Sequence, residues 1–188
     1  MYVSRIEMVG FKSFVEKTVV DLEPGITSVV GPNGCGKTNI CDAIRWVLGE
    51  ENVRLLRGTR AEDVIFAGTE LRKSTGFAEV SLTVSDVRDV LPVEYTDVKV
   101  TRRVFRSGDS DFLINNVPTR LKDIVDLFLG TGLGRRAYSV MERDMIDWIL
   151  DNMSGQRRKI IEEAAGISKY KVRRKETQSN LLVFSIKG

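Results

Sequence analysis

Residues 31–38 carry the pattern with the clearest chemistry in this chain, G-x-x-x-x-G-K-[ST], which here reads Gly31-Pro32-Asn33-Gly34-Cys35-Gly36-Lys37-Thr38. Glycines let such a loop turn its backbone N–H groups toward phosphate oxygens, where a Cβ would obstruct the approach. Lys37 can reach the outer phosphates, and the hydroxyl of Thr38 can hold Mg²⁺. The loop therefore predicts a site for the phosphates of a nucleotide.

A strand before this loop and a helix after it are needed to position it. The β-branched run Ile26–Val30 predicts the strand. Beyond the loop, apolar residues recur at helical spacing until Gly49, and they predict the helix; they are Ile40, Ala43, Ile44, Val47 and Leu48. The N-terminus of that helix would add the positive end of its dipole to the phosphate site.

A second acidic residue is needed by P-loop ATPases, to hold Mg²⁺ or polarise water at the end of a buried strand. Asp86 is the nearest candidate, but Glu79–Val84 before it alternates polar and apolar residues, as a half-exposed antiparallel strand does. The chain has no histidine, which excludes a histidine base or metal ligand. The sequence therefore predicts nucleotide binding without the parts for hydrolysis.

Composition sets the class of protein. At 188 residues the chain is predicted to form one domain. It contains no run of 18 apolar residues and no signal-peptide pattern, which predicts a cytoplasmic protein without a membrane partner. Cys35 lies in the phosphate loop and Cys41 in the following helix, so the two cysteines indicate neither a disulfide framework nor a zinc site.

Strands are predicted mainly in the first half of the chain and helices in the second. The strands are Tyr2–Val9, Lys17–Leu22, Glu79–Val84, Val98–Arg106 and Asp111–Asn115, the last two forming a hairpin. A helix is predicted from Leu121 to Leu129, with Thr119 as its N-cap and Gly130 as its stop. Further helical stretches follow near 144–151 and 155–178.

The last of these stretches is strongly basic. Residues 155–178 carry eight Lys or Arg against three Glu. Within residues 168–178 almost nothing is apolar, and the pattern favours a solvated helix leaving the domain, such as the root of a coiled coil. A contact with the phosphate backbone of DNA is the alternative, because clustered cations supply affinity that does not depend on sequence.

Five motifs occur in the order seen in one protein family. They are Gly10-Phe11-Lys12-Ser13-Phe14, Gly31–Asn39, Leu56-Arg57-Gly58, Glu62–Gly68 and Arg158–Ile167. From Met1 to about Gln178 the chain resembles the N-terminal half of bacterial SMC (structural maintenance of chromosomes) proteins, ABC-type ATPases of chromosome condensation and segregation. The resemblance implies an α/β P-loop NTPase fold: the N-terminal lobe of an ABC-type head with an antiparallel β subdomain, followed by helices and the start of a coiled-coil arm.

The same resemblance implies a domain division and a set of partners. Residues 1–167 would be the ATP-binding lobe, 168–178 the start of the arm, and 179–188 an atypical tail. A C-terminal lobe would bring the Walker B acid, the signature motif and the switch residues, and hydrolysis is expected only with it. Two completed heads would sandwich ATP as a homodimer, at the DNA of the nucleoid and with accessory condensin subunits.

Site residues are also implied by the resemblance. Those assigned to ATP are Lys12, Ser13, Gly31, Pro32, Asn33, Gly34, Cys35, Gly36, Lys37, Thr38 and Asn39, with Thr38 also the Mg²⁺ ligand. Arg57 falls where the family has a finger-like arginine near the phosphates, linked to DNA-stimulated hydrolysis. A guanidinium suits that role because it is always charged. The alternative is a surface arginine in the basic loop Arg54–Arg60.

Two positions depart from the family pattern. Arg143, followed by Asp144, stands where the family has the glutamine that touches Mg²⁺ and the attacking water, and an arginine has no acceptor for a cation. Glu142 or Asp144 would be the substitutes. After Gln178 a mostly apolar tail replaces the charged heptads, which suggests a truncated or frame-shifted reading frame, with an extra strand or an appended tail as the alternatives.

Other functions fit parts of the sequence. A small P-loop kinase would use the loop at 130–136, with Arg135 and Arg136, as a lid. A RecF- or RecN-like DNA-repair head and a non-catalytic fragment that pairs with intact heads are closer rivals. Residues 153–157 look like a compressed ABC signature motif, but Ser154 is better explained as the N-cap of the basic helix.

Overall fold

The computed structural model describes residues 1–131, Leu133, Ala165, Ile167, Tyr170, Lys171, Arg174, Thr177 and Gln178. The chain divides into two compact units, Met1–Leu127 and Phe128–Gly188. The predictions for Arg143, the helix near 144–151, Ser154 and the tail at 179–188 lie outside the described residues. In the stretch 155–178, the described residues from Ile167 onward are helical and exposed.

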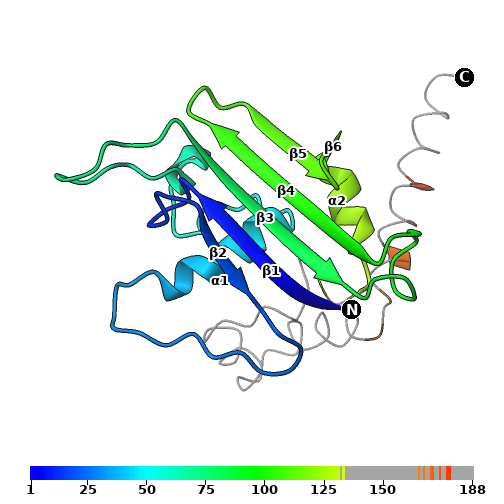
Figure 1. The fold of residues 1–188 in the computed structure, drawn as a ribbon. Helices are drawn as coiled ribbons and strands as arrows, with labels where there is room; N and C mark the ends of the chain where they lie inside the picture. The colour runs from blue at the N-terminus through cyan, green and yellow to red at the C-terminus, as the bar shows by residue number, and fades with distance from the viewer. Residues whose placement is uncertain are drawn as a thin grey trace, which may run out of the picture. The chain divides into compact units, whose positions relative to one another are not determined.

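One six-stranded sheet, in the order β2-β1-β3-β4-β5-β6, organises the first unit (Figure 1). Its strands are β1 Tyr2–Val9, β2 Thr18–Asp21, β3 Phe77–Ser85, β4 Asp97–Phe105, β5 Ser110–Ile114 and β6 Val117–Thr119. Every neighbouring pair is antiparallel. The five strands and the hairpin named above are therefore confirmed.

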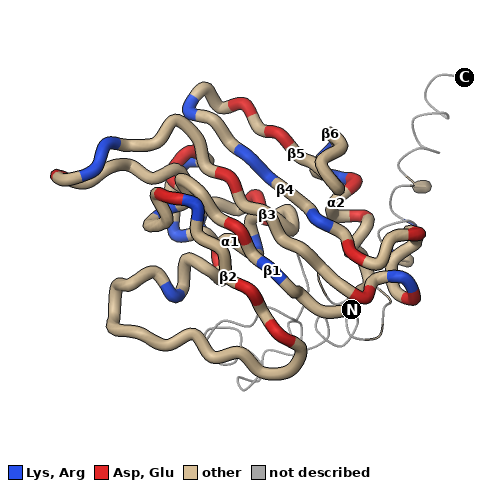
Figure 2. The backbone as a smooth tube through the Cα atoms, viewed as in Figure 1, with Lys and Arg blue, Asp and Glu red and all other residues tan. Residues whose placement is uncertain are grey.

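Alternation along the strands gives the sheet one apolar and one charged face. Ile6 pairs with Leu82, and Leu82 with Val100, and all three are buried on the apolar face. Figure 2 shows charged residues spaced along β1, β3 and β4. The other face of β3 is less open than predicted, because the buried hydroxyls of Ser81 and Thr101 form a 2.8 Å hydrogen bond there.

The helix that follows the phosphate loop, α1 Lys37–Val47, contacts β3 and β4. It buries Ala43, Trp46 and Val47, and the ring of Trp46 lies 5.3 Å from that of Phe11. Ile40 and Ile44 are only partly buried, so the apolar face is rotated slightly from the one that the spacing predicts. Among the described helices, none is long and apolar enough to cross a membrane.

The strand predicted at Ile26–Val30 does not form, and this prediction is wrong for the structure. The segment has no regular secondary structure, and Ile26 is 100% exposed and Val30 86% exposed. A strand needs a neighbour for its N–H and C=O groups, and no described strand lies alongside this run. Its β-branched composition favours a strand, but no strand among the described residues pairs with this segment.

The two remaining elements are the short 3₁₀ helix η1 Ala61–Val64 and the helix α2 Leu121–Leu127. Thr119 is not the N-cap of α2. Its hydroxyl donates to the carboxylate of Asp123 at 3.0 Å, and the same carboxylate accepts the backbone N–H of Arg120. The helix ends at Leu127, before Gly130, which adopts a left-handed φ of 82°.

Candidate nucleotide-binding site

The phosphate loop enters α1 through Gly36, whose φ of 93° is left-handed. No side chain caps this end of the helix, and its first turn contains no acidic residue. The first N–H groups of a helix have no partner inside the helix, so an uncapped N-terminus without an acidic residue in its first turn favours an anion. The helix predicted to follow the phosphate loop is confirmed as α1.

The Lys37 ammonium folds back over its own loop. Its Nζ donates to the carbonyl oxygens of Gly31 at 2.7 Å and Pro32 at 2.6 Å, and it lies 3.8 Å from the sulfur of Cys35. A Cβ on Gly31 would lie 2.8 Å from that sulfur, so the loop is tightly packed on itself. Phosphate oxygens would be stronger acceptors for this ammonium than the two carbonyls it now contacts.

The Lys12-Ser13 turn lies against the start of α1. The side-chain amide of Asn39 donates to the Ser13 hydroxyl at 2.8 Å. A Cβ on Gly36 would lie only 2.7 Å from the same hydroxyl oxygen, so glycine is required for this close approach. The turn is fixed from the other side, because the N–H of Lys12 donates to the carbonyl of Val64 at 2.7 Å.

Arg57 joins the same group of side chains. Its Nη2 donates to the amide oxygen of Asn39 at 2.9 Å and to the carboxylate of Asp42. Lys12 donates to the same carboxylate and to the carbonyl of Leu56. The fold thus brings together Lys12, Ser13, Asn39 and Arg57, four residues that the sequence singles out from three separate segments.

Asp42 was not predicted. It is the only carboxylate of α1 and is fully buried, although buried carboxylates are rare in proteins unless they are paired. The available signal was an acidic residue placed among the apolar residues of a helix that leaves a phosphate loop. Its meaning depends on the positions of Lys12 and Arg57, which the sequence of α1 does not contain.

The loop that carries Arg57 is held by Asp63 of η1. The Asp63 carboxylate accepts the N–H groups of Thr59 at 2.7 Å and Arg60 at 2.9 Å, and the hydroxyl of Thr59 at 2.8 Å. These hydrogen bonds, first among them the one from Thr59, lower the pKa of Asp63. The segment that follows Arg57 is therefore anchored at neutral pH, where this carboxylate is ionised.

The described residues offer few groups that could act as a second acid or bind a metal ion. Asp86 is exposed beyond the end of β3, an antiparallel strand, which agrees with its weak standing as a second acid. Thr38 is also exposed. Across the part of the chain that the structure describes, no cluster of three or more His, Cys, Asp or Glu could hold a metal by itself. A hydroxyl such as that of Thr38 suits Mg²⁺, which usually keeps several waters and binds substrate phosphates.

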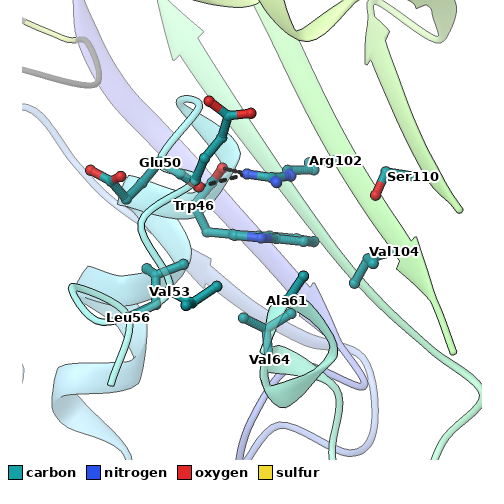
Figure 3. Close-up of a pocket in the computed structure, with 10 residues that line it drawn as sticks. Trp46, Glu50, Val53, Leu56, Ala61, Val64, Arg102, Val104 and Ser110 are labelled. Carbon is teal, nitrogen blue, oxygen red and sulfur yellow. Dashed lines mark hydrogen bonds between the residues drawn. The ribbon is translucent and has the colours of Figure 1, made fainter. Parts of the chain in front are cut away.

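A separate cavity of about 210 Å³ lies at the other end of α1 (Figure 3). Trp46, Val64 and Val104 are among the residues that line it. Arg102 also lines it and donates to the carbonyls of Trp46 at 2.9 Å and Glu50 at 2.8 Å, with its guanidinium 4.7 Å from the centre of the Trp46 ring. None of the predicted site residues lines this cavity, and its polar contacts fix the C-terminal end of α1.

Known proteins match nearly the whole chain. The family model described as "RecF/RecN/SMC N terminal domain" matches residues 2–177. The chromosome partition protein Smc of Bacillus subtilis (strain 168) is 52% identical over 181 residues, which cover 96% of this chain and 15% of that protein. This chain therefore spans about 15% of the length of the curated relative.

Two solved structures also match. One, described as the SmcHead bound to the C-winged helix domain of ScpA, is 32% identical, has a TM-score of 0.81, and is matched over 92% of this chain and 53% of its own. The other comes from work on ATP-driven dimerization and DNA-stimulated activation of SMC ATPases. It is 29% identical, has a TM-score of 0.78, and is matched over 87% of this chain and 99% of its own.

Proposed function

We propose that this chain, which belongs to the RecF/RecN/SMC N terminal domain family, is the ATP-binding N-terminal part of the head of a chromosome-organising ATPase. The observation that carries the proposal is the junction of the phosphate loop with α1. There Lys37, an uncapped helix N-terminus and the Lys12, Ser13, Asn39 and Arg57 side chains meet around one turn of helix. The identity to Smc favours this function over that of a RecF- or RecN-like repair head.

In this proposal each part of the loop has a role toward MgATP. The backbone N–H groups of the loop, which exclude Pro32 because proline has none, and those of the first turn of α1 hold the β- and γ-phosphates. Lys37 exchanges its two carbonyl acceptors for phosphate oxygens, and the Thr38 hydroxyl completes the shell of Mg²⁺. Mg²⁺ would neutralise phosphate charge, while Lys12 and Ser13 line the approach to the nucleotide.

Arg57 is the residue that we assign to catalysis. Its guanidinium is tied to Asn39, two residues after Lys37 in the sequence, and its side chain is 52% exposed. An always-charged guanidinium that is held next to a phosphate loop can offset the negative charge that develops on the transferred phosphoryl group. The contact with Asn39 favours this role over that of an unattached surface arginine.

Hydrolysis requires a second lobe in this proposal. Asp86, the nearest candidate for the second acid, is exposed beyond the end of an antiparallel strand, and Ile26 and Val30 are also exposed. A C-terminal lobe would supply the acid and a neighbouring strand for this segment. By analogy with the two matched structures, we also propose ATP-dependent pairing with a second head, stimulation by DNA and an accessory subunit of the ScpA kind.

Steady-state ATP turnover tests the proposal. We expect the chain alone to be inactive, and its mixture with the C-terminal lobe from the same genome to hydrolyse ATP unless Lys37→Ala is present. Turnover by the chain alone would contradict the divided site, since it requires an acid inside this chain. ATP binding without turnover in the mixture would support a non-catalytic interaction fragment, a function that the sequence change at Arg143 favours.

A further inference from the structure

We propose that Asp42 is a positioning residue that holds Arg57 toward the bound phosphates, with Lys12 as the second cation on the same carboxylate. The inference rests on the proposed binding of ATP at residues 31–38. It adds to that site a residue that makes no contact with the phosphates itself.

The contacts converge on a single oxygen atom. Lys12 and Arg57 both donate to Oδ2 of Asp42, while Oδ1 makes no hydrogen bond to any residue that the structure describes. The Asp42 side chain is 1% exposed and that of Lys12 is 13% exposed. Because a buried carboxylate without a cation would be costly, Asp42 and its two partners stabilise one another's positions.

Both partners occupy unusual backbone conformations. The φ angles of Lys12 and Arg57 are 49° and 56°, in the left-handed region that side chains other than glycine rarely adopt. Such residues persist only where their surroundings hold them, and they gather at functional sites. Two separate loops adopt this geometry at the residue that contacts Asp42, which indicates that the carboxylate is what they are built to reach.

Only one nitrogen of the Arg57 guanidinium is held by hydrogen bonds. Its Nη2 donates both hydrogen bonds, to Asn39 and Asp42, whereas Nε and Nη1 make no hydrogen bond among the described residues. The guanidinium fork therefore keeps N–H groups for a phosphate while its direction is fixed. Lys12, which also donates to the carbonyl of Leu56, instead ties its own loop to that of Arg57.

The charges of this cluster suit an anionic ligand. One carboxylate faces two cations, so the group of Lys12, Asp42 and Arg57 carries an excess of one positive charge at neutral pH. Asp42 thus removes the mutual repulsion of the cations without neutralising both. An amide at this position would preserve the shape but lose the charge that holds Arg57.

Binding of MgATP to the full chain, measured by calorimetry, tests the role of Asp42. We expect Asp42→Asn to weaken binding about tenfold, and only about twofold when Arg57→Ala is already present, since contacting residues couple to this extent. Glu79→Gln is the matched control, because it removes a carboxylate that pairs with Arg103 on the charged face of the sheet. An equal loss in both backgrounds, or unchanged or tighter binding by Asp42→Asn, would overturn the inference.

A second measurement reads the position of Arg57 directly and requires no nucleotide. In the full chain, NMR should resolve the two Nη groups of Arg57, assigned with Arg57→Lys, because the held guanidinium rotates slowly about its Nε–Cζ bond. The signals should merge in Asp42→Asn. Freely rotating Nη groups in the unsubstituted chain would overturn the inference, and this result does not depend on whether Asp42→Asn folds. Failure of the unsubstituted chain to bind MgATP, with the Nη groups resolved, would instead reject the proposed function and the role toward phosphates, while the hold of Asp42 on Arg57 would stand.

Discussion

At Gly36 both the backbone conformation and a neighbouring side chain disfavour a larger residue. The φ of 93° already disfavours a Cβ, and the Ser13 hydroxyl oxygen would lie only 2.7 Å from that Cβ. Gly25 has a φ of 110° with nothing within 4 Å, and so has the first of these constraints without the second. Alanine substitutions at the two glycines therefore distinguish the cost of backbone strain from the cost of the close contact with Ser13.

We predict that Gly25→Ala lowers the free energy of unfolding by about 1 kcal/mol, through backbone strain alone. Gly36→Ala should lower it by about 2 kcal/mol, because the contact with Ser13 is added to the strain. Thermal unfolding of the two variants measures the difference. Adding Ser13→Ala should recover most of the extra loss in Gly36→Ala, because it removes the clashing oxygen. Equal losses for the two glycine variants would mean that Ser13 gives way without cost.

At the scale of elements, Glu7 connects strands that are not neighbours. From β1 its carboxylate pairs with Lys17, just before β2, at 2.8 Å, and with Lys99 of β4, on the far side of β3, at 3.1 Å. These contacts, led by the hydrogen bond from Lys17, lower the pKa of Glu7. The ionised carboxylate is therefore the form that the folded sheet prefers.

A carboxylate whose pKa is lowered by folding stabilises the native state above its unfolded pKa, which is about 4.3 for Glu. That contribution is lost as the pH falls through the lower, folded pKa. We predict that Glu7→Gln lowers the Tm at pH 7 and that the gap from the parent chain narrows as the pH is reduced from about 5 to 3. Glu70→Gln, at an exposed position, is the control. A gap independent of pH would rule out this account.

The elements also differ in how far the sequence could predict them. The strands of the sheet were predictable, because alternation records the burial of one face, as at Ile6 and Leu82. The strand at Ile26–Val30 was not, because a strand depends on a neighbour that composition does not reveal. The cluster at Asp42 was missed for a related reason, since its cations lie 30 and 15 residues away. The phosphate loop itself was predictable because its chemistry is local.

For the molecule as a whole, the exposed segment Ile26–Val30 should matter only when a partner is present. We predict that Ile26→Ser with Val30→Ser changes the stability of this chain by less than about 0.5 kcal/mol, because both residues are exposed. The same pair should weaken association with the C-terminal lobe about tenfold or more, as measured by calorimetry. Leu71→Ser, at a residue 94% exposed elsewhere, is the control. Undiminished association would show that the segment lies outside the interface.

The hydrogen bonds from Arg102 attach one end of α1 to the sheet and leave the other end without such an attachment. Because Arg102 of β4 donates to the Trp46 and Glu50 carbonyls, the far end of α1 is held against the sheet, whereas no side chain caps its N-terminal end. If the chain binds ATP as proposed, the accompanying rearrangement is therefore expected at the N-terminal end of α1, where Lys37 would exchange the Gly31 and Pro32 carbonyls for phosphate oxygens. The change made by the nucleotide would then pass into the loops around this end of α1, while the opposite end of the helix stays attached to β4.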